Sequence, residues 1–159
     1  MAKQLLGKEV TAALNERIKG DVEKLKAKGV IPMLGIVRVG ERPDDLSYER
    51  GAVKRCETLG VSYEKYLLPE NVSQDELMET IRTVNKREDI HGVLIFRPLP
   101  GHLDEKEVIR ALDPEKDVDG FHVQNAGSLM LGQEGLTPCT PAGCIRLIES
   151  TGIPIEGKH

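Results

Sequence analysis

The segment Ile31-Pro-Met-Leu-Gly-Ile-Val-Arg-Val39 is short and mostly apolar, and Gly and Pro bound it, which is typical of a buried strand. Val61–Leu67 and His91–Phe96 are further predicted strands, and helical patterns separate the three. Strands that alternate with helices indicate βαβ units, so we predict an α/β fold, a three-layer αβα domain with a mainly parallel sheet. Ligands of such sheets bind beyond the carboxyl ends of the strands, which here means Gly40–Asp45 and Arg97–Gly101.

Local signals predict where the first two helices begin and end. The first is amphipathic and ends near Gly29, and its apolar residues recur at three and four positions: Leu6, Val10, Ala13, Leu14, Ile18, Val22 and Leu25. We expect Asp44 or Asp45 to cap a second helix that runs to about Leu59, with Gly60 as its stop.

Three further helices follow from similar signals. Ser73 and Glu76 have the spacing of a capping box, which predicts a helix to about Arg87. A short helix is expected over Asp104–Leu112. Pro141 suits the first position of a last helix, because its missing N–H needs no partner there.

Composition restricts the class of protein. The 159 residues are enough for one ordinary domain with a single core, and 39% hydrophobic with 30% charged residues is typical of a soluble protein. The net charge of −4 provides no basic surface for nucleic acid or an anionic membrane. No apolar run approaches the roughly 18 residues of a membrane span, and the N-terminus lacks a secretory segment. We therefore expect a cytoplasmic protein with neither membrane nor nucleic-acid partners.

The potential metal ligands are scattered. Cys56, Cys139 and Cys144 are an odd count without a Cys-x-x-Cys pair, and the four histidines have no metal-ligand spacing. We expect free thiols and no metal site.

Three motifs occur in a characteristic order. Arg97–Pro100 reads Arg-Pro-Leu-Pro, Pro114–His122 reads Pro-Glu-Lys-Asp-Val-Asp-Gly-Phe-His, and Pro138–Pro141 reads Pro-Cys-Thr-Pro. Together these segments resemble the N-terminal catalytic domain of the bifunctional methylenetetrahydrofolate dehydrogenase/cyclohydrolase family. The resemblance covers nearly the whole chain, from Val39-Gly40 to Gly157-Lys158-His159.

This resemblance implies one-carbon folate chemistry. Members oxidise 5,10-methylenetetrahydrofolate to the 5,10-methenyl form by hydride transfer to NAD or NADP, most then hydrolyse it to 10-formyltetrahydrofolate, and they are commonly homodimers. The chain contains no Gly-x-Gly-x-x-Gly. We therefore expect residues 1–150 to be the folate-binding catalytic domain and residues 151–159 to begin the linker or strand into an NAD(P)-binding domain that is absent, so that the chain alone is inactive. The choice between NAD and NADP stays open.

The resemblance also implies roles for particular residues. Tyr48 would stack on the folate, and Asp119 would accept hydrogen bonds from the amino-pyrimidine edge of the pterin, whereas Asp117 fits a turn residue. Leu99 and Pro98 would form an apolar wall, and Phe96 is a further candidate for substrate binding. We take Tyr48 and Arg97 as the candidate catalytic residues. Thr140 would lie where the cofactor approaches.

Three positions depart from the family pattern. The family's Tyr-x-x-x-Lys has Ala52 in place of the lysine, and Lys54 lies roughly 240° around the helix from Tyr48. The family's Gln-Leu-Pro-Leu-Pro begins here with Phe96 and Arg97. Arg97 can stabilise negative charge but is a poor general base, unless it is merely a solvated loop cation. We predict a dehydrogenase with weakened cyclohydrolase activity; the alternative is a non-catalytic folate-binding or assembly module.

Overall fold

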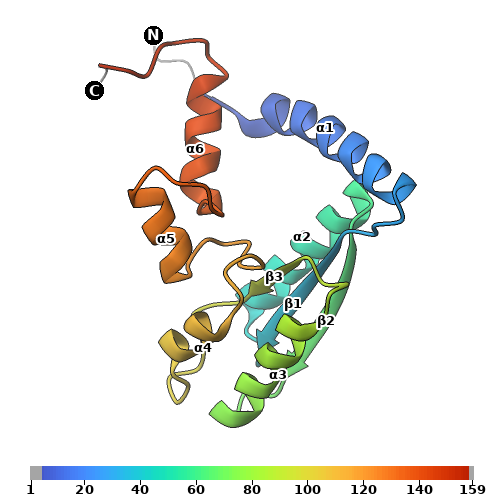
Figure 1. Cartoon of the computed structure of the whole chain (residues 1–159), viewed down its shortest axis with the longest axis vertical. Helices are drawn as coiled ribbons and strands as arrows, with labels where there is room; N and C mark the ends of the chain where they lie inside the picture. The colour runs from blue at the N-terminus through green and yellow to red at the C-terminus, as the bar shows by residue number, and fades with distance from the viewer. Residues whose placement is uncertain (1–4, 158–159) are drawn as a thin grey trace.

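The computed structural model describes residues 5–157; Lys158 and His159, the last residues of the expected linker, lie outside them. The elements in chain order are α1 (Gly7–Ala27), β1 (Met33–Val39), α2 (Pro43–Leu59), β2 (Ser62–Leu68), α3 (Gln74–Lys86), β3 (Gly92–Ile95), α4 (Glu105–Ala111), α5 (Val123–Met130) and α6 (Cys139–Glu149) (Figure 1). None of these helices is long and apolar enough to cross a membrane.

The three strands form one parallel sheet in the order β2-β1-β3, with β1 at its centre. Val37 lies opposite Tyr66 on one side and Ile95 on the other. Both neighbours of β1 are reached through a helix, as parallel pairing requires. The predicted α/β fold with a parallel sheet is confirmed.

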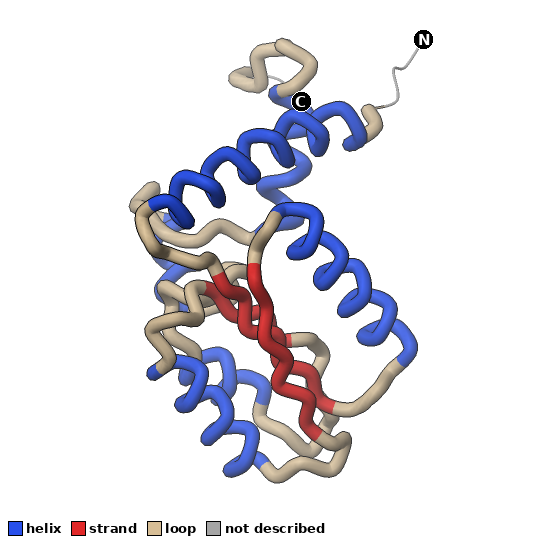
Figure 2. The backbone as a smooth tube through the Cα atoms, turned by 90° about the vertical axis from the view of Figure 1, so that its right-hand side faces the viewer, coloured by secondary structure: helices blue, strands red, loops and turns tan. Residues whose placement is uncertain are grey.

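Helices lie on both faces of the sheet (Figure 2). The larger core cluster joins one face to α3 and α4 and includes Leu77, Ile81 and Val108, all fully buried. The smaller cluster joins the other face to α2 and consists of Ile36, Leu94 and Phe96, against which Ala52 packs. Because successive strand residues point to opposite faces, Ile95 and Phe96 belong to different clusters. These are the three predicted layers.

Two of the predicted helix signals are present in the structure. The Ser73 hydroxyl oxygen accepts a bond from the Glu76 backbone N–H, and the Glu76 carboxylate accepts one from the Ser73 backbone N–H, at 3.3 and 3.1 Å. This is the predicted capping box. Gly60 ends α2 with φ of +74°, a left-handed conformation that glycine adopts without a Cβ clash.

Other helix ends were predicted wrongly. Helix α2 begins at Pro43 with Arg42 in the cap position, and both oxygens of Asp45 instead bind the Arg42 guanidinium at 2.8 and 2.9 Å. Helix α6 begins at Cys139, so Pro141 is its third residue rather than its first. The sequence prediction also missed α5, because its eight residues carry too short a pattern to register as a helix.

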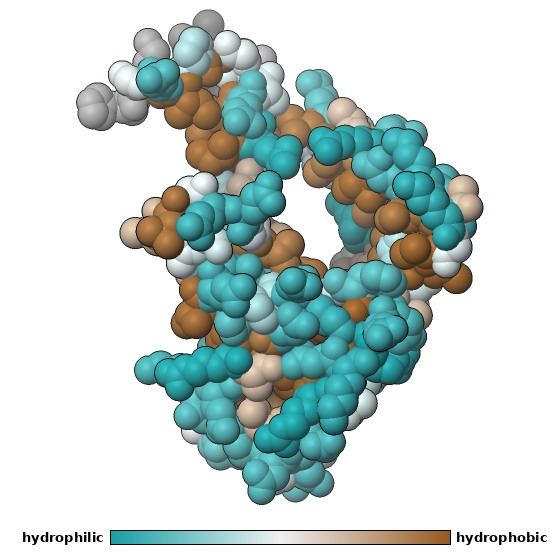
Figure 3. Space-filling view, viewed as in Figure 1, coloured by the Kyte–Doolittle hydropathy of each residue, from teal (hydrophilic) through white to brown (hydrophobic). Residues whose placement is uncertain are grey.

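Hydrophobic side chains are exposed mainly away from the sheet. Figure 3 shows them over α1, α5 and α6, whereas the surface around α3 and α4 is mostly hydrophilic. Met130 at the end of α5 is 87% exposed.

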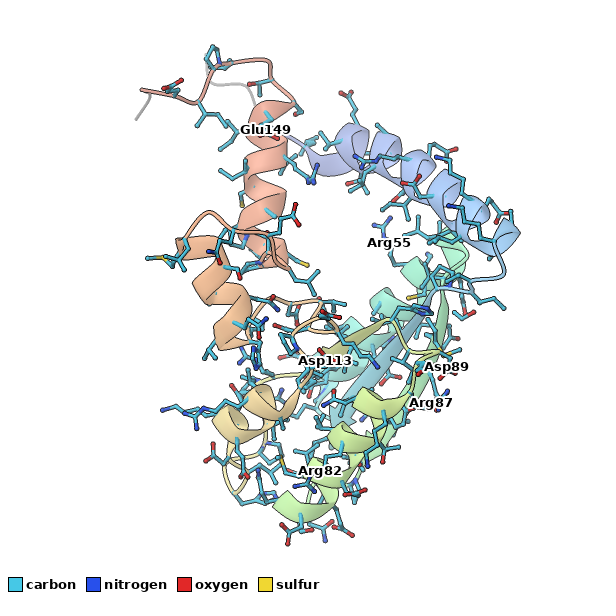
Figure 4. All side chains as sticks on the ribbon, viewed as in Figure 1. Arg55, Arg82, Arg87, Asp89, Asp113 and Glu149 are labelled. Atoms are coloured by element: carbon cyan, nitrogen blue, oxygen red, sulfur yellow. The ribbon has the colours of Figure 1, made fainter. Side chains whose placement is uncertain are left out.

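A buried ionic cluster fixes α2 against the sheet. The Arg38 Nε of β1 lies 2.7 Å from one carboxylate oxygen of Glu49, and the Lys65 Nζ of β2 lies 2.8 Å from the other. Arg38 also donates to the carbonyl of Gly40, at the end of β1. Burial acts to raise the pKa of Glu49, but the bonds from Lys65 and Arg38 outweigh it and hold that pKa below its ordinary value. In contrast, the pair of Arg87 with Asp89, 2.6 Å apart, lies at the surface (Figure 4).

We expect Glu49→Leu to destabilise the fold by about 3–5 kcal/mol, because it leaves the Arg38 charge buried and unpaired. Arg38→Met combined with Glu49→Leu should recover most of this loss. The free energies of unfolding from urea titrations check both, and equal values for the single and double variants would contradict the role of the buried charge.

Candidate functional site

A cleft of about 430 Å³ opens beyond the carboxyl ends of β1 and β3, the edge that the sequence predicted. Its walls come from three regions of the chain. Helix α2 contributes Tyr48, the end of β3 contributes Phe96 and Arg97, and the segments after α4 contribute Asp119 and Thr140. The structure thus brings together five of the seven predicted site residues in a space of ligand size.

Pro98 and Leu99 do not line this cleft. Leu99 is partly buried and packs against the larger core cluster, on the α3 and α4 face of the sheet. Pro98 is exposed. The structure therefore does not bring the predicted apolar wall to the cleft, whose apolar part is formed instead by Leu94, Ile95 and Phe96.

Two of the three aromatic rings that line the cleft, those of Tyr48 and Phe96, are in contact. The centroids of Tyr48 and Phe96 are 5.4 Å apart at an interplanar angle of 72°, the edge-to-face arrangement that aromatic pairs favour. Phe96 is buried, whereas Tyr48 is 62% exposed, so the Tyr48 ring remains accessible to a ligand. Burial raises the pKa of the Tyr48 hydroxyl, and the charge of Asp119 raises it further. The hydroxyl is therefore a protonated donor at neutral pH.

Asp117 holds the loop that carries the cleft residues. It bridges Val93 of β3 in parallel fashion, and its side chain is buried. Its carboxylate accepts hydrogen bonds from the His122 backbone N–H at 2.7 Å and from the Asn125 amide at 3.1 Å. These contacts fit the structural role that the sequence suggested for Asp117.

Asp119, two residues later, has a different environment from Asp117. It lines the cleft, and its carboxylate has no hydrogen-bond partner among residues 5–157. Burial raises its pKa, the charge of Asp117 raises it further, and the charge of Arg97 lowers it. A partly buried carboxylate without partners is an acceptor available to a ligand.

Arg97 is held in place on two sides. Its Nη1 lies 2.9 Å from an oxygen of Glu105, and its guanidinium carbon lies 3.8 Å from the centre of the Phe121 ring. The other Glu105 oxygen accepts from the Leu99 backbone N–H at 3.0 Å. These contacts exclude the reading of Arg97 as a solvated loop cation.

Sequence reasoning missed both partners of Arg97. Glu105 lies in the acidic first turn of α4, where it complements the helix dipole, and this local role gives no indication of the contact. Phe121 was quoted within a motif without a role. An arginine, a glutamate at the start of the next helix and an aromatic residue at a turn are separately unremarkable, so only the fold reveals the contact.

Two of the departures from the family pattern, Ala52 and Phe96, lie on one apolar surface. Ala52 packs against the cluster that contains Phe96 and lines a groove beside the cleft, which it shares with Tyr48. Lys54 lines neither the cleft nor this groove. No group of three His, Cys, Asp or Glu side chains among residues 5–157 is arranged to hold a metal ion.

Comparison with known proteins agrees with this geometry. Residues 5–119 match the family model described as the tetrahydrofolate dehydrogenase/cyclohydrolase catalytic domain. The chain belongs to this family. Its match covers the sheet, α2 and Asp119, which are the main parts of the cleft.

Relatives and solved structures extend the likeness. The bifunctional protein FolD of Carboxydothermus hydrogenoformans is 45% identical over 100% of this chain and 56% of its own length. The bifunctional FolD structure from Campylobacter jejuni has a TM-score of 0.94 at 39% identity, covering 97% of this chain and 55% of that one. A Trypanosoma brucei FolD structure, in complex with NADP cofactor and inhibitor, has a TM-score of 0.92 at 29% identity, covering 99% and 54%. The chain spans about half the length of the curated relatives it matches.

We expect Asp117→Ala to lower the free energy of unfolding by about 1–3 kcal/mol, because the buried donors that it satisfies lose their acceptor. Asp119→Ala should change stability by less than about 0.5 kcal/mol, since no described protein donor depends on it. Urea unfolding of both variants tests the assignment, and an equal loss in the two would contradict it.

Proposed function

We propose that this chain is the folate-binding catalytic domain of a methylenetetrahydrofolate dehydrogenase in which the cyclohydrolase activity is weakened. The reaction is oxidation of 5,10-methylenetetrahydrofolate to 5,10-methenyltetrahydrofolate, with NAD or NADP as the hydride acceptor. The observation that carries the proposal is a ligand-sized cleft in which the unpartnered Asp119 carboxylate and the exposed Tyr48 ring share one space.

Each cleft residue has a separate task in this proposal. The Tyr48 ring stacks on the folate, and its protonated hydroxyl donates a hydrogen bond. Asp119 accepts from the amino-pyrimidine edge of the pterin, because a carboxylate offers two oxygens to a planar pair of donors. Phe96 holds the Tyr48 ring in position through their edge-to-face contact.

NAD or NADP is the second ligand of the proposed reaction. When bound, it supplies the acceptor for the hydride, and Thr140 at the edge of the cleft is the residue we assign to its approach. No Gly-x-Gly-x-x-Gly occurs in this chain, so these residues do not form a dinucleotide site of that type. A cytoplasmic homodimer belongs to the same proposal and rests on the family resemblance alone.

Weak hydrolysis follows from the chemistry of the cleft wall. Hydride transfer depends chiefly on holding two rings in the correct geometry. Hydrolysis of the methenyl form also needs groups that transfer protons to and from water. Ala52 and Phe96 offer none, and an arginine such as Arg97, here paired with Glu105, is a poor general base.

We expect the domain to bind tetrahydrofolate derivatives weakly and to catalyse no NAD(P)-dependent oxidation alone. Asp119→Asn should weaken binding by about tenfold or more, because the pterin donors lose a charged acceptor. The matched control is Asp75→Asn, at the exposed start of α3. Calorimetric titration measures all three proteins, and parental affinity in Asp119→Asn would contradict the assignment.

The same titration has a predicted pH dependence. Burial raises the pKa of Asp119, so in the free domain this carboxyl becomes protonated at a higher pH than an ordinary aspartate. Affinity should therefore fall as the pH drops through that raised pKa, and Asp119→Asn should abolish this dependence.

In the enzyme with its cofactor domain, Ala52→Lys together with Phe96→Gln should raise methenyltetrahydrofolate hydrolysis more than the two single changes combined. The lysine and glutamine would act as one hydrogen-bonded unit. Lys54→Ala is the control and should leave the rate unchanged. Absorbance of the methenyl form follows the reaction, and a fast parental hydrolysis unaffected by all of these changes would refute the weakened cyclohydrolase.

A further inference from the structure

Arg97 is a fixed hydrogen-bond donor in the wall of the cleft. One face of its guanidinium covers the Phe121 ring at 3.8 Å, and its Nη1 is held by Glu105 at 2.9 Å. Glu105 is itself restrained by its bond from the Leu99 backbone N–H. An arginine has five N–H donors in a rigid plane, and Glu105 binds only at Nη1. The Arg97 Nε and Nη2 have no hydrogen-bond partner among residues 5–157, so these donors remain available to a ligand.

Asp119 provides a hydrogen-bond acceptor in the same cleft. Both residues line the main cleft, and both line a small cavity that adjoins it. Asp119 has no described hydrogen-bond partner, and the two side chains are close enough for the Arg97 charge to lower the Asp119 pKa. The cleft therefore presents a rigid donor and an unoccupied acceptor side by side, without a hydrogen bond that joins them.

This arrangement matches one edge of the pterin ring. The 2-amino-4-oxopyrimidine edge carries two donors, the 2-amino group and N3–H, followed by an acceptor, the 4-oxo group. We propose that Arg97 is a specificity-determining residue that donates to the 4-oxo group while Asp119 accepts from the two donors. The inference rests on the proposed function, because it assumes that a folate occupies the cleft.

The consequence is selectivity against 4-amino pterins. A 4-amino group would direct its own N–H at the Arg97 donors, so two donors would face each other and the arginine would lose its acceptor. The leucine of the family pattern at this position has no side-chain donor and could not make this distinction. Position 97 thus adds a chemical test of the ligand that the family pattern lacks.

Calorimetric titration with three ligands tests the inference: folic acid, its 4-amino analogue and its 2-desamino analogue, in neutral buffer, which keeps the diaminopteridine ring uncharged and the N3–H of folic acid in place. The unmodified chain should prefer the 4-oxo over the 4-amino ligand by about tenfold. Arg97→Met should reduce this preference and leave the preference for a 2-amino group intact. Asp119→Asn should reduce both preferences, because N3 carries no hydrogen in the neutral 4-amino ring and Asp119 also faces that position. The control for lost charge is Arg110→Met on the exposed side of α4, which should change neither preference.

A second variant guards against a folding defect in Arg97→Met. Arg97→Gln carries an amide that can donate or accept, so it should reduce the preference for the 4-oxo ligand as Arg97→Met does. If folic acid binds but both Arg97 variants keep the parental preference, the inference is overturned and the proposed function stands. If the unmodified chain binds none of the three ligands, the proposed function fails and the inference fails with it.

Discussion

The site depends on one buried carboxylate, that of Asp117. Its backbone extends the edge of the sheet by pairing with Val93, and the Val93 N–H donates to the Lys116 carbonyl at 2.6 Å. Its side chain then fixes the chain on the far side of the turn through His122 and Asn125. Gly120 completes that turn with φ of +67°, and a Cβ there would come within 3.0 Å of the backbone of residues 136–138. Asp119 and Phe121 are thus set at the cleft by contacts that they do not make themselves.

The cleft differs from the family pattern on both sides of this turn. On the α2 side, Ala52 and Phe96 form part of an apolar surface where the family pattern has lysine and glutamine. On the α4 side, Arg97, Glu105 and Phe121 form a charged and aromatic cluster. Ala52 and Phe96 thus place no charge in the cleft, and Arg97 lies on the α4 side, where Glu105 balances it.

Local chemistry explains which parts of the structure the sequence could predict. The capping box at Ser73, the stop at Gly60 and the three strands depend on neighbouring residues, and all were predicted. The Tyr48 and Asp119 positions followed from spacing within a resembled family, and the fold brings both to one cleft. The roles assigned to these residues remain predictions.

The contacts that sequence reasoning missed join residues across the fold. Glu105 reaches Arg97 only because α4 turns back towards the end of β3. Leu99 was expected beside the ligand because it follows the strand, yet it packs against the core on the other face of the sheet. The start of α2 was misplaced because Asp45 binds the Arg42 side chain rather than the backbone. In each case the position depends on the reach of a long side chain or on which face of the sheet a residue occupies. Neither can be read from a few neighbouring residues of the sequence.

The charge balance of the cleft fits hydride loss better than hydrolysis. Its lining contains Asp44, Asp45 and Asp119 but, among the described residues, a single cation, Arg97, whose charge Glu105 already balances. Loss of a hydride from the methylene carbon leaves a cation delocalised over two nitrogens, and fixed negative charge stabilises such a transition state. Attack by water needs a base instead, and two of the three carboxylates are engaged: Asp45 by Arg42, and Asp119, in our proposal, by the pterin. In our proposal, the residues that hold the substrate therefore favour the formation of the methenyl cation more than its hydrolysis.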